Sequence, residues 1–512
     1  MAPTTEEGKA LSTASGIELR SIDWVPHEER HGKVWHLGGV WFSGNAELST
    51  TATGVLAISL GGNLIWTMLA LLIGTLFGTF FTAFHSAQGP QLGLPQMIQS
   101  RAQFGYLGVA ILVLPFMVFN YAGYNVFNGL LAAGAMENVI GGDIKIWLVV
   151  VSLVALVAAI WGYDLIHLSQ RWLTYGFIIF FGVYTIGVLA TIGFPAGSWD
   201  LGGDSFQTTP FLASFALAVS YQIGWAPYVS DYSRYLPASA GVKATFMWTY
   251  WPLVIAGVWM FWMGAIIAAP IADQAPGTID AIRSTGDDIF TNFGAIVLLL
   301  SVPALVLIIA MNMYGGGLVL ISMVDSFKQI KPALWHRVTS ILAIAITSLV
   351  FAFYSTSNDD FLGYYNNLIV MLLYFFAPWT AVNLVDYFIV RKGHYAIREI
   401  FNPDGLYGRW GWNGIIAYVA GFVSMIPFMV IGTDGTKFEW WIGPIARNLD
   451  FADISVFIGL PVSSIVYLIL ARRLDLEAER QLEASEGHMT FAEIEEEPDV
   501  HASRPDAGPD RV

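Results

Sequence analysis

The stretch VWFSGNAELSTTATG, residues 40–54, opens a long apolar segment with an unexpected run of polar residues. Glu47 lies at its centre. A carboxylate that faces lipid costs about 2.5 kcal/mol or more, so Glu47 is expected to face the protein interior. Gly44 and the hydroxyl residues that follow Glu47 predict an interrupted helix here, the kind of break from which membrane proteins build polar sites.

The composition of the chain is that of a polytopic membrane protein. Of its 512 residues 55% are hydrophobic and 12% charged, whereas a soluble chain is about 25% charged. Several apolar runs exceed the ~18–20 residues that cross a bilayer as a helix. Twelve spans are predicted, at residues 38–60, 64–87, 106–136, 145–163, 172–194, 210–230, 246–269, 291–323, 334–354, 366–390, 412–432 and 452–471. The predicted fold class is therefore all-α.

The chain divides into three parts. A polar tail (1–36) precedes a twelve-helix domain (37–474), and an acidic segment (475–512) follows it. The acidic segment carries much of the net charge of −15 and is predicted to be disordered. The charges of the domain nearly balance, which argues against nucleic-acid binding. Without cysteine there are no disulfides or thiolate-ligated metals, and no cofactor is predicted.

Lysine and arginine set the expected orientation. They concentrate in the two tails and in alternate joints between spans, while the other joints are acidic. The positive-inside rule then places both termini in the cytoplasm of a multi-pass protein of the cell membrane. The polar N-terminal tail argues against a cleavable signal peptide.

The sixth span has a break that parallels the first. In SYQIGWAPYVSDYSRYLP, residues 220–237, Gly224 and Pro227 interrupt the helix next to Tyr221, Gln222 and Trp225. A proline-kinked helix with interfacial aromatics is the alternative. Two interruptions five spans apart predict inverted repeats of five helices, at about 37–194 and 210–390, with extra helices at 411–471.

Two other spans carry amides. In FNYAGYNVFNG, residues 119–129, Tyr121, Asn125 and Asn128 share part of one helix face. In AMNMYGGGL, residues 310–318, Asn312 precedes three glycines. Aromatic rings with amides suit a flat, uncharged heterocycle, because rings stack on its faces and amides bind its edge. Hydrogen bonding and close packing between helices is the alternative.

The joint HSAQGPQLGLPQMIQSRAQFG, residues 85–105, contains Pro90, Pro95 and three glycines. This predicts an irregular first half and a short helix that begins at Pro95.

Three motifs together resemble one family. GPQLGLPQMIQSRAQFG (89–105), WAPYVSDYSRYLP (225–237), and NLVDYFIVRKGHY (383–395) with FNPDGLYG (401–408) are similar to the purine–cytosine permease group of nucleobase–cation symporter family 1. The resemblance extends over about residues 21–473. It implies a leucine-transporter-like fold, with ten helices as two inverted repeats and two more helices, and a substrate between helices one, three, six and eight.

The resemblance also implies site residues. Tyr121 and Asn125 match an aromatic and an amide of the third helix, and Asn312 matches an amide of the eighth. Tyr221 and Gln222 fall at contacts of the sixth helix, with Trp225 one turn further on. Glu47 falls where a relative has a glutamine near the substrate.

The chain departs from sodium-coupled relatives at the implied ion site. Ser43 and Ala46 fall at the helix-one positions, but Pro303, Val306 and Leu307 replace the hydroxyl ligands of helix eight. Sodium needs several hard oxygen ligands, so protons are favoured over sodium as the coupled cation. A midplane carboxyl can be neutral when desolvated and charged when hydrated. The hypothesis is that Glu47 carries the proton; a carboxyl that only binds substrate or caps the broken helix is the alternative.

Charged residues at the ends of spans have a different interpretation. Asp231 with Arg234, and Asp386 with Arg391, are predicted to form structural or gating ion pairs. The predicted function is proton-coupled import of cytosine or a purine. Transport of uracil, allantoin, hydantoin or pyridoxine-like compounds, and a non-pumping channel or sensor, remain alternatives. An enzyme is disfavoured because the histidines fall in joints rather than in one cluster.

Overall fold

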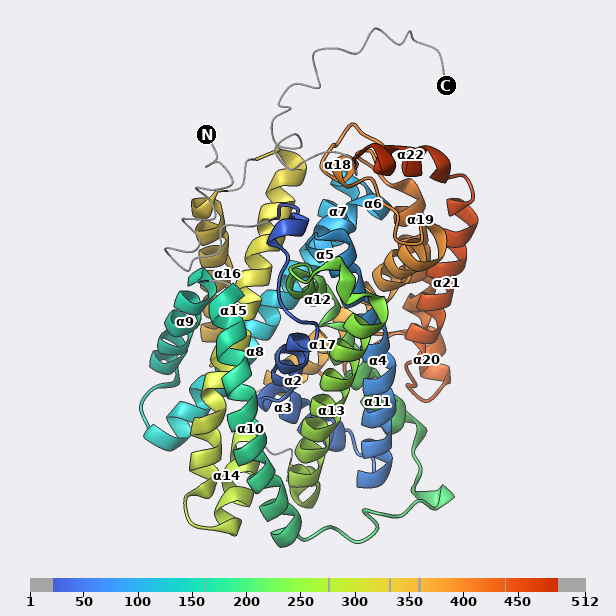
Figure 1. Cartoon of the computed structure of the whole chain (residues 1–512). Coiled ribbons are helices and arrows are strands. Elements are labelled where there is room, and N and C mark those ends of the chain that lie inside the picture. The colour runs from blue at the N-terminus through green and yellow to red at the C-terminus, as the bar shows by residue number, and fades with distance from the viewer. Residues whose placement is uncertain are drawn as a thin grey trace.

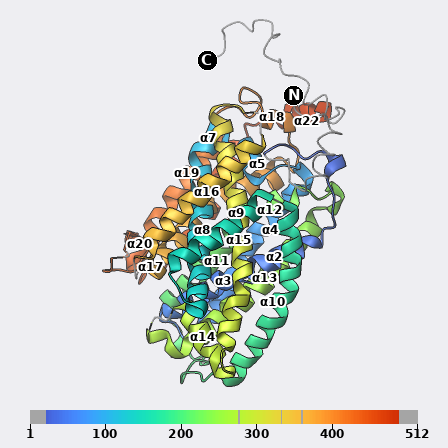
Figure 2. The ribbon, with the colours of Figure 1, turned by 90° about the vertical axis from the view of Figure 1, so that its left-hand side faces the viewer.

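The computed structural model describes residues 22–161, 163–274, 277–330, 333–357, 361–437 and 439–486. These residues form a bundle of long helices, shown from two sides in Figures 1 and 2. The long continuous helices are α4 (Leu64–Leu92), α9 (Ile144–Trp161), α10 (Tyr163–Thr191), α13 (Val242–Ala268), α15 (Phe293–Phe327), α16 (Leu334–Ser355), α17 (Phe361–Val385), α19 (Trp412–Met425) and α21 (Ser455–Ala471).

Three further spans are pairs of helices separated by a break. They are α2 (His36–Asn45) with α3 (Leu48–Ser59), α7 (Tyr106–Leu112) with α8 (Leu114–Ile140), and α11 (Thr208–Ile223) with α12 (Ala226–Ser233). Each of the twelve predicted spans thus coincides with a helix or a broken pair. By length and apolarity alone, six helices of the described residues qualify as membrane-spanning, and eight if each bent pair counts as one. The first and sixth of the twelve predicted spans do not qualify, because the break divides each of them into halves that are too short alone.

Short elements connect the bundle. The short α-helices are α5 (Gln96–Gln99), α6 (Arg101–Phe104), α14 (Thr278–Ile289), α18 (Ile397–Ile400), α20 (Pro444–Asn448) and α22 (Leu476–Glu486). The 3₁₀ turns are η1 (His27–Glu29), η2 (Gly203–Ser205), η3 (Ala238–Ala240), η4 (Ala269–Gln274) and η6 (Ile426–Phe428), and η5 (Asp386–Val390) is a π-helical turn. Strands β1 (Val430–Ile431) and β2 (Trp441–Ile442) pair antiparallel, with Val430 opposite Ile442.

The broken first span lies inside the bundle, and glycines let it pack closely. In Figure 1, α2 and α3 lie centrally, near α13. A Cβ added at Gly54 of α3 would lie 2.1 Å from the backbone oxygen of Phe261 in α13, and one at Gly264 would lie 2.0 Å from that of Thr51. These glycines therefore permit backbone contact between α3 and α13.

Helix α4 runs further than predicted. It continues through Pro90 to Leu92 and ends at Gly93, whose φ of +67° is left-handed. The expectation of an irregular chain from residue 85 is thus wrong. Proline removes the N–H that would bond to the carbonyl four residues earlier, which here belongs to Ser86. The Ser233 hydroxyl of α12 donates to that oxygen over 2.7 Å instead, so the helix tolerates Pro90.

The first part of the acidic segment is ordered, which corrects the prediction of disorder for residues 476–486. These residues form α22, which lies beside α18 at one end of the bundle (Figure 1). Its Glu479 is only 3% exposed and binds Arg391. This contact gives a short polar helix a fixed position. Residues 487–512 lie outside the described residues, as do residues 1–21.

Candidate functional site

Glu47 occupies the break between α2 and α3. The backbone is extended at this residue, with φ −158° and ψ 172°, and its carboxylate caps α3 by accepting a hydrogen bond from the Ser49 N–H over 2.9 Å. The side chain is fully buried. Its other oxygen accepts from the Tyr221 hydroxyl over 2.7 Å. Glu47 is therefore a helix cap that also reaches the broken sixth span.

A small cavity adjoins Glu47, with a volume of about 10 Å³. It receives side chains from both broken spans and from α8 and α15. The residues that line it are Glu47, Ser49, Tyr124, Asn128, Tyr221, Gly224, Trp225, Tyr228, Ile308 and Asn312. This space holds about one water molecule. A larger molecule can therefore enter only if the surrounding side chains move apart.

Several polar groups of the cavity wall have no hydrogen-bond partner among the described residues. Both amide atoms of Asn128, Nδ2 of Asn312 and the hydroxyl of Tyr124 are buried in this way. The Oδ1 of Asn312, in contrast, accepts from the Tyr228 hydroxyl over 2.7 Å. A buried polar group without a partner costs about 1–3 kcal/mol. A polar ligand in the cavity could therefore recover part of that free energy.

The structure brings together four of the seven residues expected to bind substrate. Glu47, Tyr221, Trp225 and Asn312 line the cavity. Tyr121, Asn125 and Gln222 do not line the cavity. Their role as substrate ligands stays a prediction.

Helix geometry and packing together explain the difference on α8. Residues one position apart point about 100° apart around a helix, so Asn125 points away from Tyr124. Tyr121 lies two turns before Asn128 on nearly the same face, but it does not reach the cavity. The Tyr121 ring instead packs on Tyr228, 4.3 Å between centroids. The spacing of Tyr124 and Asn128, four residues apart, is the signal that could have identified this face.

Gln222 fastens the two broken spans to each other. Its Oε1 accepts from Asn45 Nδ2 over 3.0 Å, and the same nitrogen donates to the Leu253 carbonyl over 2.8 Å. Asn45 Oδ1 accepts from the Trp225 indole over 2.8 Å. The end of α2 is thus bound to the break between α11 and α12 through buried amides.

Comparison with known proteins identifies the family of the chain. A family model described as permeases for cytosine/purines, uracil, thiamine and allantoin matches residues 24–452. The chain belongs to this permease family. The putative purine-cytosine permease YxlA of Bacillus subtilis is 36% identical over 457 residues, which cover 89% of this chain and 96% of YxlA. The purine-cytosine permease fcyB of Emericella nidulans is 24% identical over 486 residues, which cover 90% and 89% of the two chains.

Solved structures confirm the predicted transporter fold. Mhp1, a nucleobase-cation-symport-1 family transporter in a closed conformation with bromovinylhydantoin bound, superposes with a TM-score of 0.71 at 14% identity and covers 92% of this permease and all of Mhp1. A Na⁺-coupled sialic acid symporter reaches 0.60 at 11% identity, covering 92% and 96% of the two chains. At these identities the likeness concerns the fold alone. As a permease, the protein is a polytopic membrane transporter and not an enzyme.

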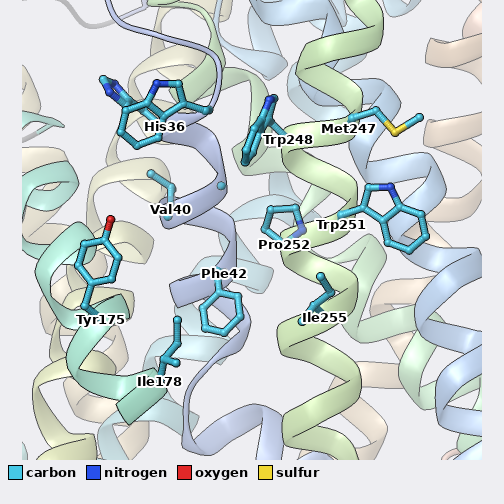
Figure 3. Close-up of a pocket in the computed structure, with 13 residues that line it drawn as sticks. His36, Val40, Phe42, Tyr175, Ile178, Met247, Trp248, Trp251, Pro252 and Ile255 are labelled. Carbon is cyan, nitrogen blue, oxygen red and sulfur yellow. The ribbon is translucent and has the colours of Figure 1, made fainter. Parts of the chain in front are cut away.

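A larger cavity of about 550 Å³ lies on the outside of the permease, between α2, α10 and α13 (Figure 3). Apolar and aromatic side chains form its walls, among them Phe42, Trp248 and Ile255. Trp248 and Ile255 are exposed on the surface of the bundle. This cavity lacks the converging amides of the small one, and exposed apolar side chains form its walls, so we do not place the transport site here.

Asp386 joins several helices at the end of the permease where α22 lies. Arg391 forms an ion pair with it, and Gln103 Nε2, Tyr395 and Tyr467 each donate to it over 2.7 Å. The predicted gating role of this pair stays a prediction. Its position among the end of α17, α6 and α21 means that separation of these elements would break several bonds to one carboxylate.

Glu479 extends this network to α22. Arg391 Nε donates to its two oxygens over 2.9 and 3.0 Å, and the Tyr407 hydroxyl donates over 2.5 Å. Burial raises the pKa of Glu479, while the Arg391 guanidinium and these hydrogen bonds oppose that shift.

Asp231 and Arg234 contact other residues near the same end. Asp231 accepts from the Gln96 backbone N–H over 2.9 Å, which secures α5 to α12. Arg234 donates to the Tyr235 hydroxyl over 3.0 Å. The predicted ion pair between Asp231 and Arg234 stays a prediction.

Proposed function

We propose that this permease imports an uncharged, nucleobase-like heterocycle, cytosine or a purine, together with protons, by alternating access. The observation that carries the proposal is the wall of the small cavity. It combines the buried carboxyl of Glu47 with the unpartnered amide of Asn128, the unpartnered amide nitrogen of Asn312, and the aromatic rings of Tyr124 and Trp225. Rings can stack on a flat heterocycle while amides bind the donors and acceptors of its edge.

The charged residues of the cavity wall support an uncharged substrate. The residues that line the cavity include one carboxyl and no lysine, arginine or histidine. A negatively charged heterocycle would meet no opposite charge there, and burying an unpaired charge is costly. The named relatives also support nucleobases, because fcyB is described as a purine-cytosine permease and YxlA as a putative one. More distant relatives include a vitamin B6 transporter and an allantoin permease, so these substrate classes belong in the test.

Proton coupling rests on Glu47. A buried carboxyl that is reached alternately from the two sides can take up a proton on one side and release it on the other. Pro303, Val306 and Leu307 on α15 offer no side-chain oxygen for sodium. Import with both termini in the cytoplasm agrees with the distribution of lysine and arginine.

The test is uptake of radiolabelled cytosine by transporter-deficient cells, with unlabelled adenine, hypoxanthine, uracil, allantoin and pyridoxine as competitors. We expect accumulation that a protonophore abolishes, and competition by adenine or hypoxanthine. Glu47→Gln keeps an oxygen that can cap α3 but cannot carry the proton, so concentrative uptake should be lost while binding remains. Glu477→Gln, the same change on an exposed residue of α22, should behave as wild type. Accumulation by Glu47→Gln that still depends on pH would refute the role of Glu47.

A further inference from the structure

Three hydroxyl groups surround the carboxyl of Glu47. One of its oxygens accepts from the Tyr221 hydroxyl over 2.7 Å, from the Ser49 hydroxyl, and from the Thr50 hydroxyl over 3.4 Å. The hydroxyls also contact one another, because the Tyr221 oxygen lies 2.8 Å from that of Thr50 and 3.1 Å from that of Ser49. We call Ser49, Thr50 and Tyr221 the hydroxyl cage.

The hydroxyl cage takes the place of a positively charged partner for the Glu47 carboxylate. Among the described residues, no lysine, arginine or histidine forms an ion pair or hydrogen bond with Glu47. The titratable groups that face it are tyrosines: Tyr124 on α8, Tyr221 on α11 and Tyr365 on α17. A buried carboxylate without a counter-ion is stabilised by the hydrogen bonds that it accepts. The three hydroxyls and the Ser49 N–H supply these bonds.

Hydroxyl groups also suit the protonated form. A hydroxyl both donates and accepts, and its hydrogen can rotate. When Glu47 is charged, the cage donates to it; when Glu47 is protonated, its own O–H can donate to a cage oxygen. Both states can therefore be satisfied without movement of the heavier atoms, which a lysine or arginine partner would not permit.

We propose that Tyr221 is a positioning residue for the coupled proton, and that its hydroxyl sets how tightly Glu47 holds that proton instead of binding substrate. Ser49 and Thr50 belong to α3 and Glu47 caps it, whereas Tyr221 belongs to α11. The cage is complete only while these two helices are together. Movement of α11 away from α3 would remove a donor from the charged form and so strengthen proton binding, which links the proton to the conformation. This inference rests on the proposed role of Glu47.

The test compares Tyr221→Phe with Tyr124→Phe. Both tyrosines line the same cavity, but the Tyr124 hydroxyl has no hydrogen-bond partner among the described residues. Initial uptake rates are measured from pH 5 to 9, at several substrate concentrations. Loss of a donor favours the protonated carboxyl, so uptake by Tyr221→Phe should persist to higher pH, with its midpoint raised by about 1 pH unit. Tyr124→Phe should keep the wild-type midpoint.

Other outcomes separate this inference from the proposed function. A wild-type midpoint in Tyr221→Phe, with a raised KM, would make Tyr221 a substrate ligand and overturn the inference while leaving Glu47 in place. Wild-type uptake that depends on neither pH nor a protonophore would overturn both this inference and the proposed proton coupling. If Tyr221→Phe fails to fold, Thr50→Val removes another cage hydroxyl at nearly constant shape and should shift the midpoint in the same direction; an unshifted midpoint there would also overturn the inference.

Discussion

The contact between α3 and α13 allows a quantitative test of the packing that holds the broken first span. Gly54→Ala adds one methyl group to α3. Its carbon would lie 2.1 Å from the Phe261 backbone oxygen, whereas ordinary contacts begin at 3.4 Å. The two helices would have to separate by about 1 Å, because a backbone oxygen cannot rotate away as a side chain can.

The expected cost follows from two opposing effects. Overpacking of a core by one methyl group costs about 1–3 kcal/mol, and backbone atoms on both sides of this contact favour the upper part of that range. Replacing a helical glycine by alanine returns about 1 kcal/mol. The net destabilisation is then about 1–2 kcal/mol, roughly a tenfold fall in the ratio of folded to unfolded protein.

The assay is thermal unfolding of the purified permease in detergent. The measured quantity is the fraction of the permease that stays monodisperse at each temperature. Gly39→Ala is the matched control, because a Cβ at this position of α2 meets no atom within 4 Å. Gly54→Ala should unfold at a lower temperature than wild type, and Gly39→Ala at the same temperature or a higher one. Equal unfolding temperatures for the two variants would refute the close packing of α3 on α13.

Two further predictions concern the network at α22 and the cavity wall. Glu479→Gln removes a buried charge opposite Arg391, and we expect it to lower stability in the same thermal assay by about 1–3 kcal/mol, with the bonds of Arg391 to Asp386 retained. Asn312→Ala removes an amide of the cavity and the acceptor of the Tyr228 hydroxyl, and we expect KM for the transported heterocycle to rise about tenfold or more.

Matched variants control these two experiments. Glu477→Gln changes an exposed glutamate of α22 and should leave the unfolding temperature unchanged; a loss equal to that of Glu479→Gln would contradict the importance of the buried pair. Asn125→Ala removes a buried amide that does not line the cavity, so its effect on KM should be smaller than that of Asn312→Ala. The reverse order would indicate that Asn125, and not Asn312, binds substrate.

Sequence patterns predicted the arrangement of helices well, for physical reasons. A bilayer requires long apolar runs, and each run is visible as such in the chain. The breaks in the first and sixth spans were also predicted, because Gly44, Glu47, Gly224 and Pro227 are residues that a continuous helix in lipid does not favour. The extension of α4 through Pro90 was not predicted, because it depends on Ser233, a residue far away in the sequence.

The site was predicted only in part. Glu47, Tyr221, Trp225 and Asn312 meet at the cavity because the breaks that place them are local features of the sequence. The face of α8 was assigned incompletely, because both Tyr121 with Asn125 and Tyr124 with Asn128 have helical spacing and only packing decides between them. Tertiary contacts also explain why α22 forms an ordered helix, since its Glu479 is bound by Arg391 from another part of the chain.

Concentrative transport by this permease depends most on Glu47, the proposed carrier of the coupled proton. The most direct measurement is accumulation of radiolabelled cytosine in proteoliposomes that contain the purified permease, driven by a pH gradient or by a sodium gradient alone. We expect the wild type to concentrate cytosine under the pH gradient only, and Glu47→Gln to exchange cytosine across the membrane without ever concentrating it. Concentration driven by sodium alone, or by the pH gradient in Glu47→Gln, would contradict the role of Glu47 as the proton carrier.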